Sequence, residues 1–103
     1  MKIRKLILLT SVASASWAAD AAAGKAAYDA SCKKCHGADG TPNAAIGKML
    51  KVEMMHLGSP EVQVKSDAAL IKETVEGIGK MKAMPTVEKD AANIVAFVRT
   101  LKK

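Results

Sequence analysis

Apolar residues recur at helical spacing in the last part of the chain. Between residues 88 and 101 they stand at Ala91, Ile94, Val95, Val98 and Leu101. This spacing places one apolar stripe along a helix, which is the side that packs against the rest of a domain. Lys102 and Lys103 follow, and their positive charge suits the negative C-terminal end of a helix. The pattern predicts a final helix over residues 88–101 with one buried face.

Three earlier stretches also have helical character. Residues 21–30 are rich in alanine, and residues 44–52 form a short helix with Ile46, Met49 and Leu50 inward. A third helix is capped by Ser66 and is ended by Gly77 and Gly79. Its apolar stripe consists of Leu70, Ile71, Thr74, Val75 and Ile78.

Loops separate these helices. Residues 37–43 are rich in Gly, Asp, Asn and Pro, and Gly58-Ser59-Pro60 forms a turn. No stretch shows the alternation of apolar and polar residues that is typical of a β-strand. The sequence therefore predicts an all-α domain of about four short helices.

The first 18 residues have the pattern of a secretory signal. Lys2, Arg4 and Lys5 precede an apolar run that opens with Leu6 to Leu9, and small residues follow it. Cleavage is expected after Ala18, with Ala15 or Ala19 as alternatives. The run is shorter than the roughly 20 apolar residues that span a membrane, so a membrane anchor is less favoured than a cleaved signal. We therefore expect an exported, periplasmic protein without a membrane span, with residues 19–103 as one domain.

Removing the signal changes the composition. The net charge falls from +6 for the whole chain to +3, and Tyr28 and Phe97 are the two remaining aromatic residues. With dispersed lysines and so few rings for stacking, nucleic-acid binding is not expected. The remaining domain is small and rich in alanine, so a bound group is expected to supply much of its core.

The strongest chemical signal is Cys32-Lys33-Lys34-Cys35-His36. These are the two cysteines of the chain, and His36 is one of its two histidines. The pattern C-x-x-C-H is the attachment sequence of a c-type haem. Two thiols about one turn apart can add to both vinyl groups of a porphyrin, and the adjacent imidazole can bind the iron. We expect one haem c, bonded to Cys32 and Cys35, with His36 as proximal ligand.

Two other interpretations of these residues stay open at this point. A zinc site could use Cys32, Cys35, His36 and His56, although Cys35 and His36 are adjacent and converge poorly on one ion. A dithiol redox pair of the thioredoxin kind would need strands alternating with helices.

Several motifs in order resemble the class I c-type cytochromes. These are residues 32–37, Gly77-Ile78-Gly79-Lys80-Met81, residues 95–99 with Phe97, and the pair Gly24 and Tyr28. Gly24 lies within the first predicted helix, where a glycine allows another helix to approach closely, so we expect the first and last helices to cross there with Phe97 against Tyr28. The alternative is that each of these helices lies separately on the haem.

The resemblance also implies the ligands of the iron. It makes Met81 the distal ligand. Met84, which precedes Pro85, is the alternative because the family often has Met-Pro at this position, and His56 is a weaker one. Met81 is favoured because it lies 16 residues before Phe97, close to the usual separation in the family. The carbonyl of Pro42 is the expected hydrogen-bond acceptor for His36.

An iron with both axial positions filled can exchange electrons but has no vacancy for a substrate. We therefore expect a monomeric electron carrier and not an enzyme, with a donor and an acceptor that the sequence does not identify. Lys33, Lys34, Lys80 and Lys82 are expected to dock acidic redox partners. The alternatives are a haem enzyme or gas sensor with a labile distal ligand, and a zinc or thiol module without haem.

Overall fold

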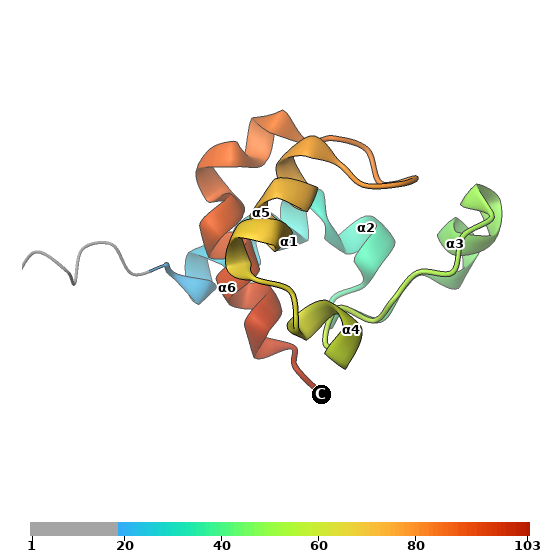
Figure 1. Cartoon of the computed structure of the whole chain (residues 1–103), viewed down its shortest axis with the longest axis horizontal. Helices are drawn as coiled ribbons and strands as arrows, with labels where there is room; N and C mark the ends of the chain where they lie inside the picture. Colours follow the sequence, from blue (N-terminus) through green and yellow to red (C-terminus); the bar gives the residue numbers. More distant parts are fainter. Residues whose placement is uncertain (1–18) are drawn as a thin grey trace, which may run out of the picture.

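The computed structural model describes residues 19–103; residues 1–18, with the predicted signal, lie outside the described part. The described chain forms six α-helices and one 3₁₀ helix and no strand (Figure 1). The elements are α1 (Ala21–Ser31), α2 (Lys33–His36), α3 (Ala44–Leu50), α4 (Pro60–Gln63), α5 (Asp67–Glu76), η2 (Pro85–Asp90) and α6 (Ala91–Thr100). The predicted all-α domain is confirmed. The four expected helices are α1, α3, α5 and α6, and the structure adds two single turns and η2.

Helices α1 and α6 cross and form the centre of the fold (Figure 1). At the crossing, the backbone of Asn93 and Ile94 approaches Gly24 so closely that a Cβ atom on Gly24 would overlap it. The rings of Tyr28 and Phe97 meet with their centroids 4.9 Å apart and a tilt of 56°. The predicted crossing at Gly24 is therefore confirmed, and the alternative of two separate helices is wrong.

The ends of α5 and α6 differ from the prediction. Ser66 caps α5 as expected, since its Oγ accepts a hydrogen bond from the Ala69 amide at 3.0 Å. Gly77, at φ +84°, ends the helix before Ile78, so Ile78 is not part of the α5 stripe and is 49% exposed. Helix α6 begins at Ala91, because Pro85 starts the separate η2 instead.

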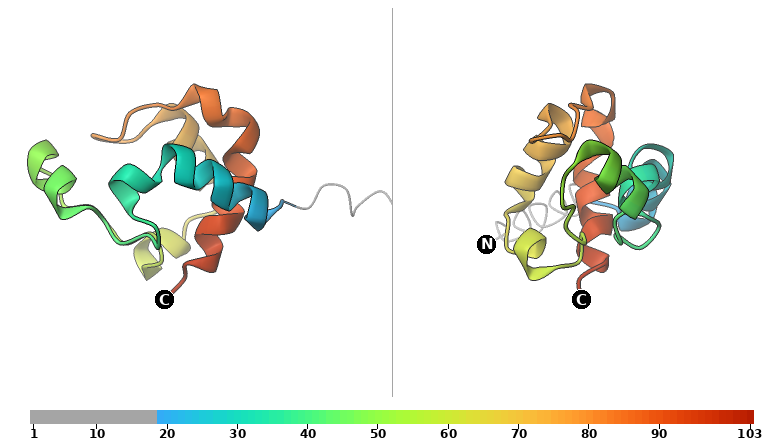
Figure 2. Two further views of the ribbon diagram at one scale, coloured as in Figure 1. Left: turned by 180° about the vertical axis from the view of Figure 1, so that it is seen from behind. Right: turned by 90° about the vertical axis from the view of Figure 1, so that its right-hand side faces the viewer.

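Helix α3 stands apart from the other helices. Its cap is Asn43, and it ends at Leu50, two residues earlier than predicted, where Lys51 takes a left-handed conformation. Figure 2 shows α3 set in front of the space between α5 and the α1–α2 segment. Met49, which was expected to point inward, is 69% exposed. The predicted turn at residues 58–60 is the start of α4, with Ser59 as cap and Pro60 in the first turn.

The buried side chains form two clusters, and each cluster includes residues of α6. The main core consists of Tyr28, Cys32, Val87, Ile94, Phe97 and Val98. The second core consists of Val62, Leu70 and Val95. Both are small, as expected for a chain in which alanine is the commonest apolar residue. No helix within residues 19–103 is long and apolar enough to cross a membrane.

Candidate functional site

A cavity of about 860 Å³ opens between the helices, within the roughly 300–1,000 Å³ range of cofactor sites. Its wall is mostly apolar and is built by the end of α1, by α2, α3, α4, α5, α6 and by residues 78–84. The predicted site residues Cys32, Cys35, His36, Met81 and Met84 all line it. A second hollow, of about 530 Å³, lies beside α3 and contains none of these residues.

The C-x-x-C-H motif forms one turn in the cavity wall. Cys32 follows α1, and its carbonyl accepts hydrogen bonds from the amides of Cys35 at 3.2 Å and His36 at 3.0 Å. The Cys32 side chain is buried in the main core, whereas Cys35 is half-buried. This turn brings both thiols and the imidazole to the same cavity, as the sequence spacing predicted.

Burial, followed by the charge of Cys35, raises the pKa of Cys32 to about 11. Cys32 is therefore a neutral thiol at neutral pH. Redox-active dithiols depend instead on a lowered thiol pKa and a reactive thiolate. Cys32 does not have the lowered pKa of such a nucleophile, and residues 19–103 have no strands to build the thioredoxin fold.

His36 lies half-buried in the cavity wall, and its Nδ1 atom is buried. Its Nδ1 atom has no hydrogen-bond partner, so the expected bond to the Pro42 carbonyl is not formed. Pro42 instead lines the second hollow. Burial lowers the pKa of His36, which favours the neutral imidazole, the form that binds a metal.

The structure separates His56 from this site. His56 does not line the cavity, and its Nδ1 accepts a hydrogen bond from the Gly58 amide at 2.8 Å. Within residues 19–103, no three His, Cys, Asp or Glu side chains are placed to hold a metal ion together. This arrangement supports neither a zinc site nor His56 as distal ligand.

The two methionines of the 78–84 loop differ in their surroundings. Met84 packs against the main core, and its amide donates to the Val75 carbonyl at 2.9 Å. Met81 lies at the end of a tight turn, in which the backbones of Ile78 and Met81 exchange hydrogen bonds of 2.9 and 3.1 Å. Met84 is thus packed against the main core, whereas Met81 lines the cavity from a tight turn.

Comparison with known proteins bears on this arrangement. The family model for cytochrome c matches residues 21–102, which include the whole motif and the 78–84 loop. The chain belongs to the cytochrome c family. It is 36% identical over 93 residues to cytochrome c-554(547) of Halothiobacillus neapolitanus, a match covering 82% of this chain and all of the relative. The solved structure of the KustC0563 c-type cytochrome superposes with a TM-score of 0.64 at 30% identity, covering 78% of this chain and 98% of that one.

Membership of the cytochrome c family confirms the expected class I c-type cytochrome and its covalently bound haem c. Cytochromes of this family carry electrons and act with redox partners. The described residues fit such a group, because a mostly apolar cavity is lined by two free thiols and by the imidazole of His36, whose pKa is lowered by burial.

Sequence reasoning missed one contact that positions the cytochrome motif. The Tyr28 hydroxyl donates a hydrogen bond to the Gly37 carbonyl at 2.6 Å, directly after His36. Burial, with smaller contributions from nearby charges, raises the pKa of Tyr28 to about 12, so this hydroxyl keeps its proton. Gly37 has φ +74°, and a Cβ atom there would overlap the Thr41 carbonyl. The glycine after the motif was visible in the sequence, but its bond to Tyr28 was not.

Proposed function

We propose that this cytochrome is an exported, periplasmic electron carrier that works as a monomer and cycles one haem between its ferrous and ferric states. The observation that carries the proposal is the convergence of Cys32, Cys35 and His36 on one apolar cavity that Met81 also lines. The signal pattern of residues 1–18 supports export, and cleavage after Ala18 would leave residues 19–103 as the domain.

Each residue would have a distinct role at this site. Cys32 and Cys35 would hold the haem by thioether bonds, and His36 would bind the proximal side of the iron. Met81, from the 78–84 loop, would fill the distal position. The bound haem supplies an iron that gains and loses one electron. The protein would bind the iron through His36 and Met81, which would leave no place for a substrate, and would surround the haem with apolar side chains.

The test is the mass and the spectrum of the exported protein from a strain able to attach haem. We expect a mass that includes one haem after denaturation, and an absorption spectrum that changes between the oxidised and reduced protein. A Cys32→Ala/Cys35→Ala variant is the control, because it cannot form thioether bonds. An exported chain with the mass of its amino acids alone would contradict the proposal.

Four lysines are proposed to guide redox partners to the mouth of this cavity. Lys33 and Lys34 lie on α2, Lys80 and Lys82 lie in the 78–84 loop, and all four are exposed. Lys34, Lys80 and Lys82 line the cavity. Positive charge at the mouth would attract an acidic partner and would accelerate its approach.

We expect the rate constant for oxidation by anionic hexacyanoferrate(III) to fall several-fold as salt shortens the Debye length from about 30 to about 8 Å. Stopped-flow absorption measures this rate constant. Lys80→Glu/Lys82→Glu should flatten the salt dependence, whereas Lys72→Glu, on an exposed part of α5 outside the cavity, should change it less. A rate constant that does not change with salt concentration in the unaltered protein would contradict the docking proposal.

A further inference from the structure

A charged pair lies in the mostly apolar wall of the haem cavity. The Nζ atom of Lys65 lies 3.1 Å from Oε1 and 3.0 Å from Oε2 of Glu73. Both side chains line the cavity and are half-buried, with 37% of Lys65 and 26% of Glu73 exposed. Among residues 19–103, it is the one ion pair with both partners in this wall.

Stability alone gives little reason for this pair. Ion pairs in contact with solvent contribute little to stability, and burial adds a desolvation cost that often cancels the attraction. Apolar side chains at these two positions would extend the second core, since Val62 and Leu70 line the same wall. We therefore expect the charges of Lys65 and Glu73 to act on the group that the cavity binds.

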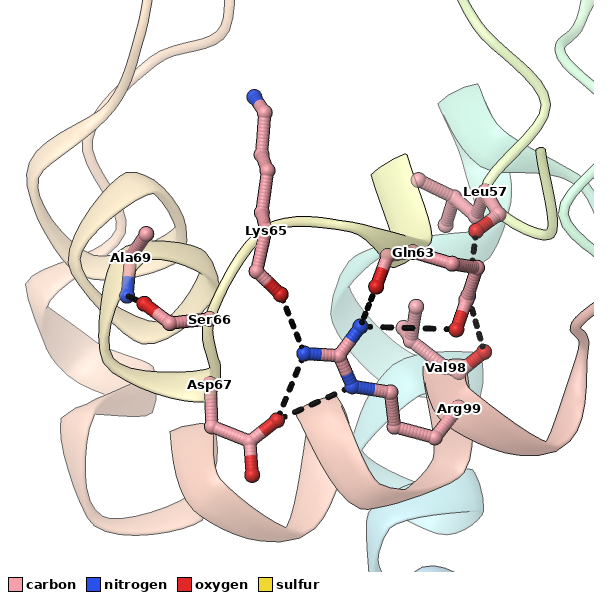
Figure 3. A network of polar contacts seen from close by, with 8 residues as sticks. All are labelled: Leu57, Gln63, Lys65, Ser66, Asp67, Ala69, Val98 and Arg99. Carbon is pink, nitrogen blue, oxygen red and sulfur yellow. Dashed lines mark hydrogen bonds and ion pairs between the residues drawn. The ribbon is translucent and has the colours of Figure 1, made fainter. Parts of the chain in front are cut away.

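Hydrogen bonds from Arg99 to the backbone hold Lys65 in place. The guanidinium of Arg99, on α6, donates to the Lys65 carbonyl at 2.6 Å and to the Gln63 carbonyl at 2.9 Å (Figure 3). It also pairs with Asp67, at 2.8 Å from Nη2 to Oδ1. This network fixes the backbone between α4 and α5. Lys65 is thereby held against Glu73, which lies on α5.

We propose that the two charges of the Lys65–Glu73 pair tune the reduction potential of the haem in opposite directions. The carboxylate of Glu73 favours the ferric state, and the ammonium group of Lys65 favours the ferrous state. This inference rests on the proposed haem-based function and names two residues that tune it.

The sign follows from charge alone. Oxidation adds one positive charge to the site. A negative group in the cavity wall attracts that charge, and a positive group repels it, more strongly than in bulk water because the surrounding medium is less polar. Removing Glu73 must therefore raise the potential, and removing Lys65 must lower it. Simple damage to the wall would admit water and favour the ferric state in both variants.

The experiment is a spectroscopic redox titration of the haem-loaded protein. For Glu73→Gln we expect the equilibrium constant for reduction to rise by up to tenfold, which equals about 59 mV for one electron. For Lys65→Met we expect a fall of similar size, and the double variant should lie between the two. Circular dichroism during thermal unfolding shows whether each variant keeps its fold. Should Glu73→Gln fail to fold, Lys65→Met still tests the proposal, because an unchanged or raised potential contradicts it.

A second ion pair serves as the control. Lys25 and Asp29 pair on α1 at 2.9 Å, and neither lines the cavity. Asp29→Asn and Lys25→Met should leave the potential nearly unchanged. Shifts of the same sign in both cavity variants, or shifts no larger than those of the controls, would overturn the inference. A protein that carries no haem would instead contradict the proposed function.

Discussion

Replacing Gly24 by alanine is expected to destabilise the folded protein by about 3 kcal/mol, near the upper end of the usual cost of overpacking. Alanine favours an isolated helix by about 1 kcal/mol over glycine, so propensity alone predicts the opposite sign. The steric term prevails because the added Cβ would overlap backbone atoms of Asn93 and Ile94. Backbone atoms within α6 cannot swing aside as a side chain can. The two helices must separate, and the Tyr28–Phe97 contact loosens with them.

Thermal unfolding followed by circular dichroism measures this effect. A loss of about 3 kcal/mol corresponds to a fall in Tm of about 12–24 °C for a domain of this size. Gly47→Ala is the matched control, since Gly47 also lies within a helix. A Cβ atom there would meet only the Val52 carbonyl, at 3.2 Å. Equal stability of the two variants would show that the crossing tolerates a methyl group at Gly24.

Replacing Met81 by alanine is expected to remove the distal ligand of the iron. The sulfur-to-iron charge-transfer band of the ferric protein should then vanish. The potential should fall by on the order of 0.1 V, because thioether ligation favours the ferrous state and axial ligands span about 0.8 V. The reduced variant should also bind carbon monoxide, since an axial position becomes vacant. Absorption spectra and a redox titration measure all three changes.

Met84→Ala is the matched control for this experiment. Met84 packs on the main core, so truncating its side chain should cost about 2 kcal/mol of stability. The charge-transfer band should persist in the Met84→Ala variant. The reverse outcome, with the band lost only in Met84→Ala, would assign the ligand to Met84. Carbon monoxide binding by the unaltered reduced protein would favour the gas-sensor or enzyme interpretation.

The helices that could be predicted from the sequence are those that local chemistry specifies. Asn43 and Ser66 cap α3 and α5 through their own side chains, and Gly77 ends α5 through its positive φ. The single turns α2 and α4 were missed because four residues are too few for a helical period. The start of α6 was misplaced because η2 continues the chain into it without a loop, and the apolar pattern does not distinguish the two helix types.

The motif Cys32-x-x-Cys35-His36 and the order of the other motifs determined the family and the covalent haem from the sequence alone. Local spacing sufficed there, because one turn of backbone brings the two thiols and the imidazole together. Only the tertiary structure removed His56 from the site, separated Met84 in the core from Met81 in its turn, and placed Lys65 beside Glu73 in the cavity wall. The positions of these side chains depend on which helices pack together. A short-range pattern of residues does not specify that packing.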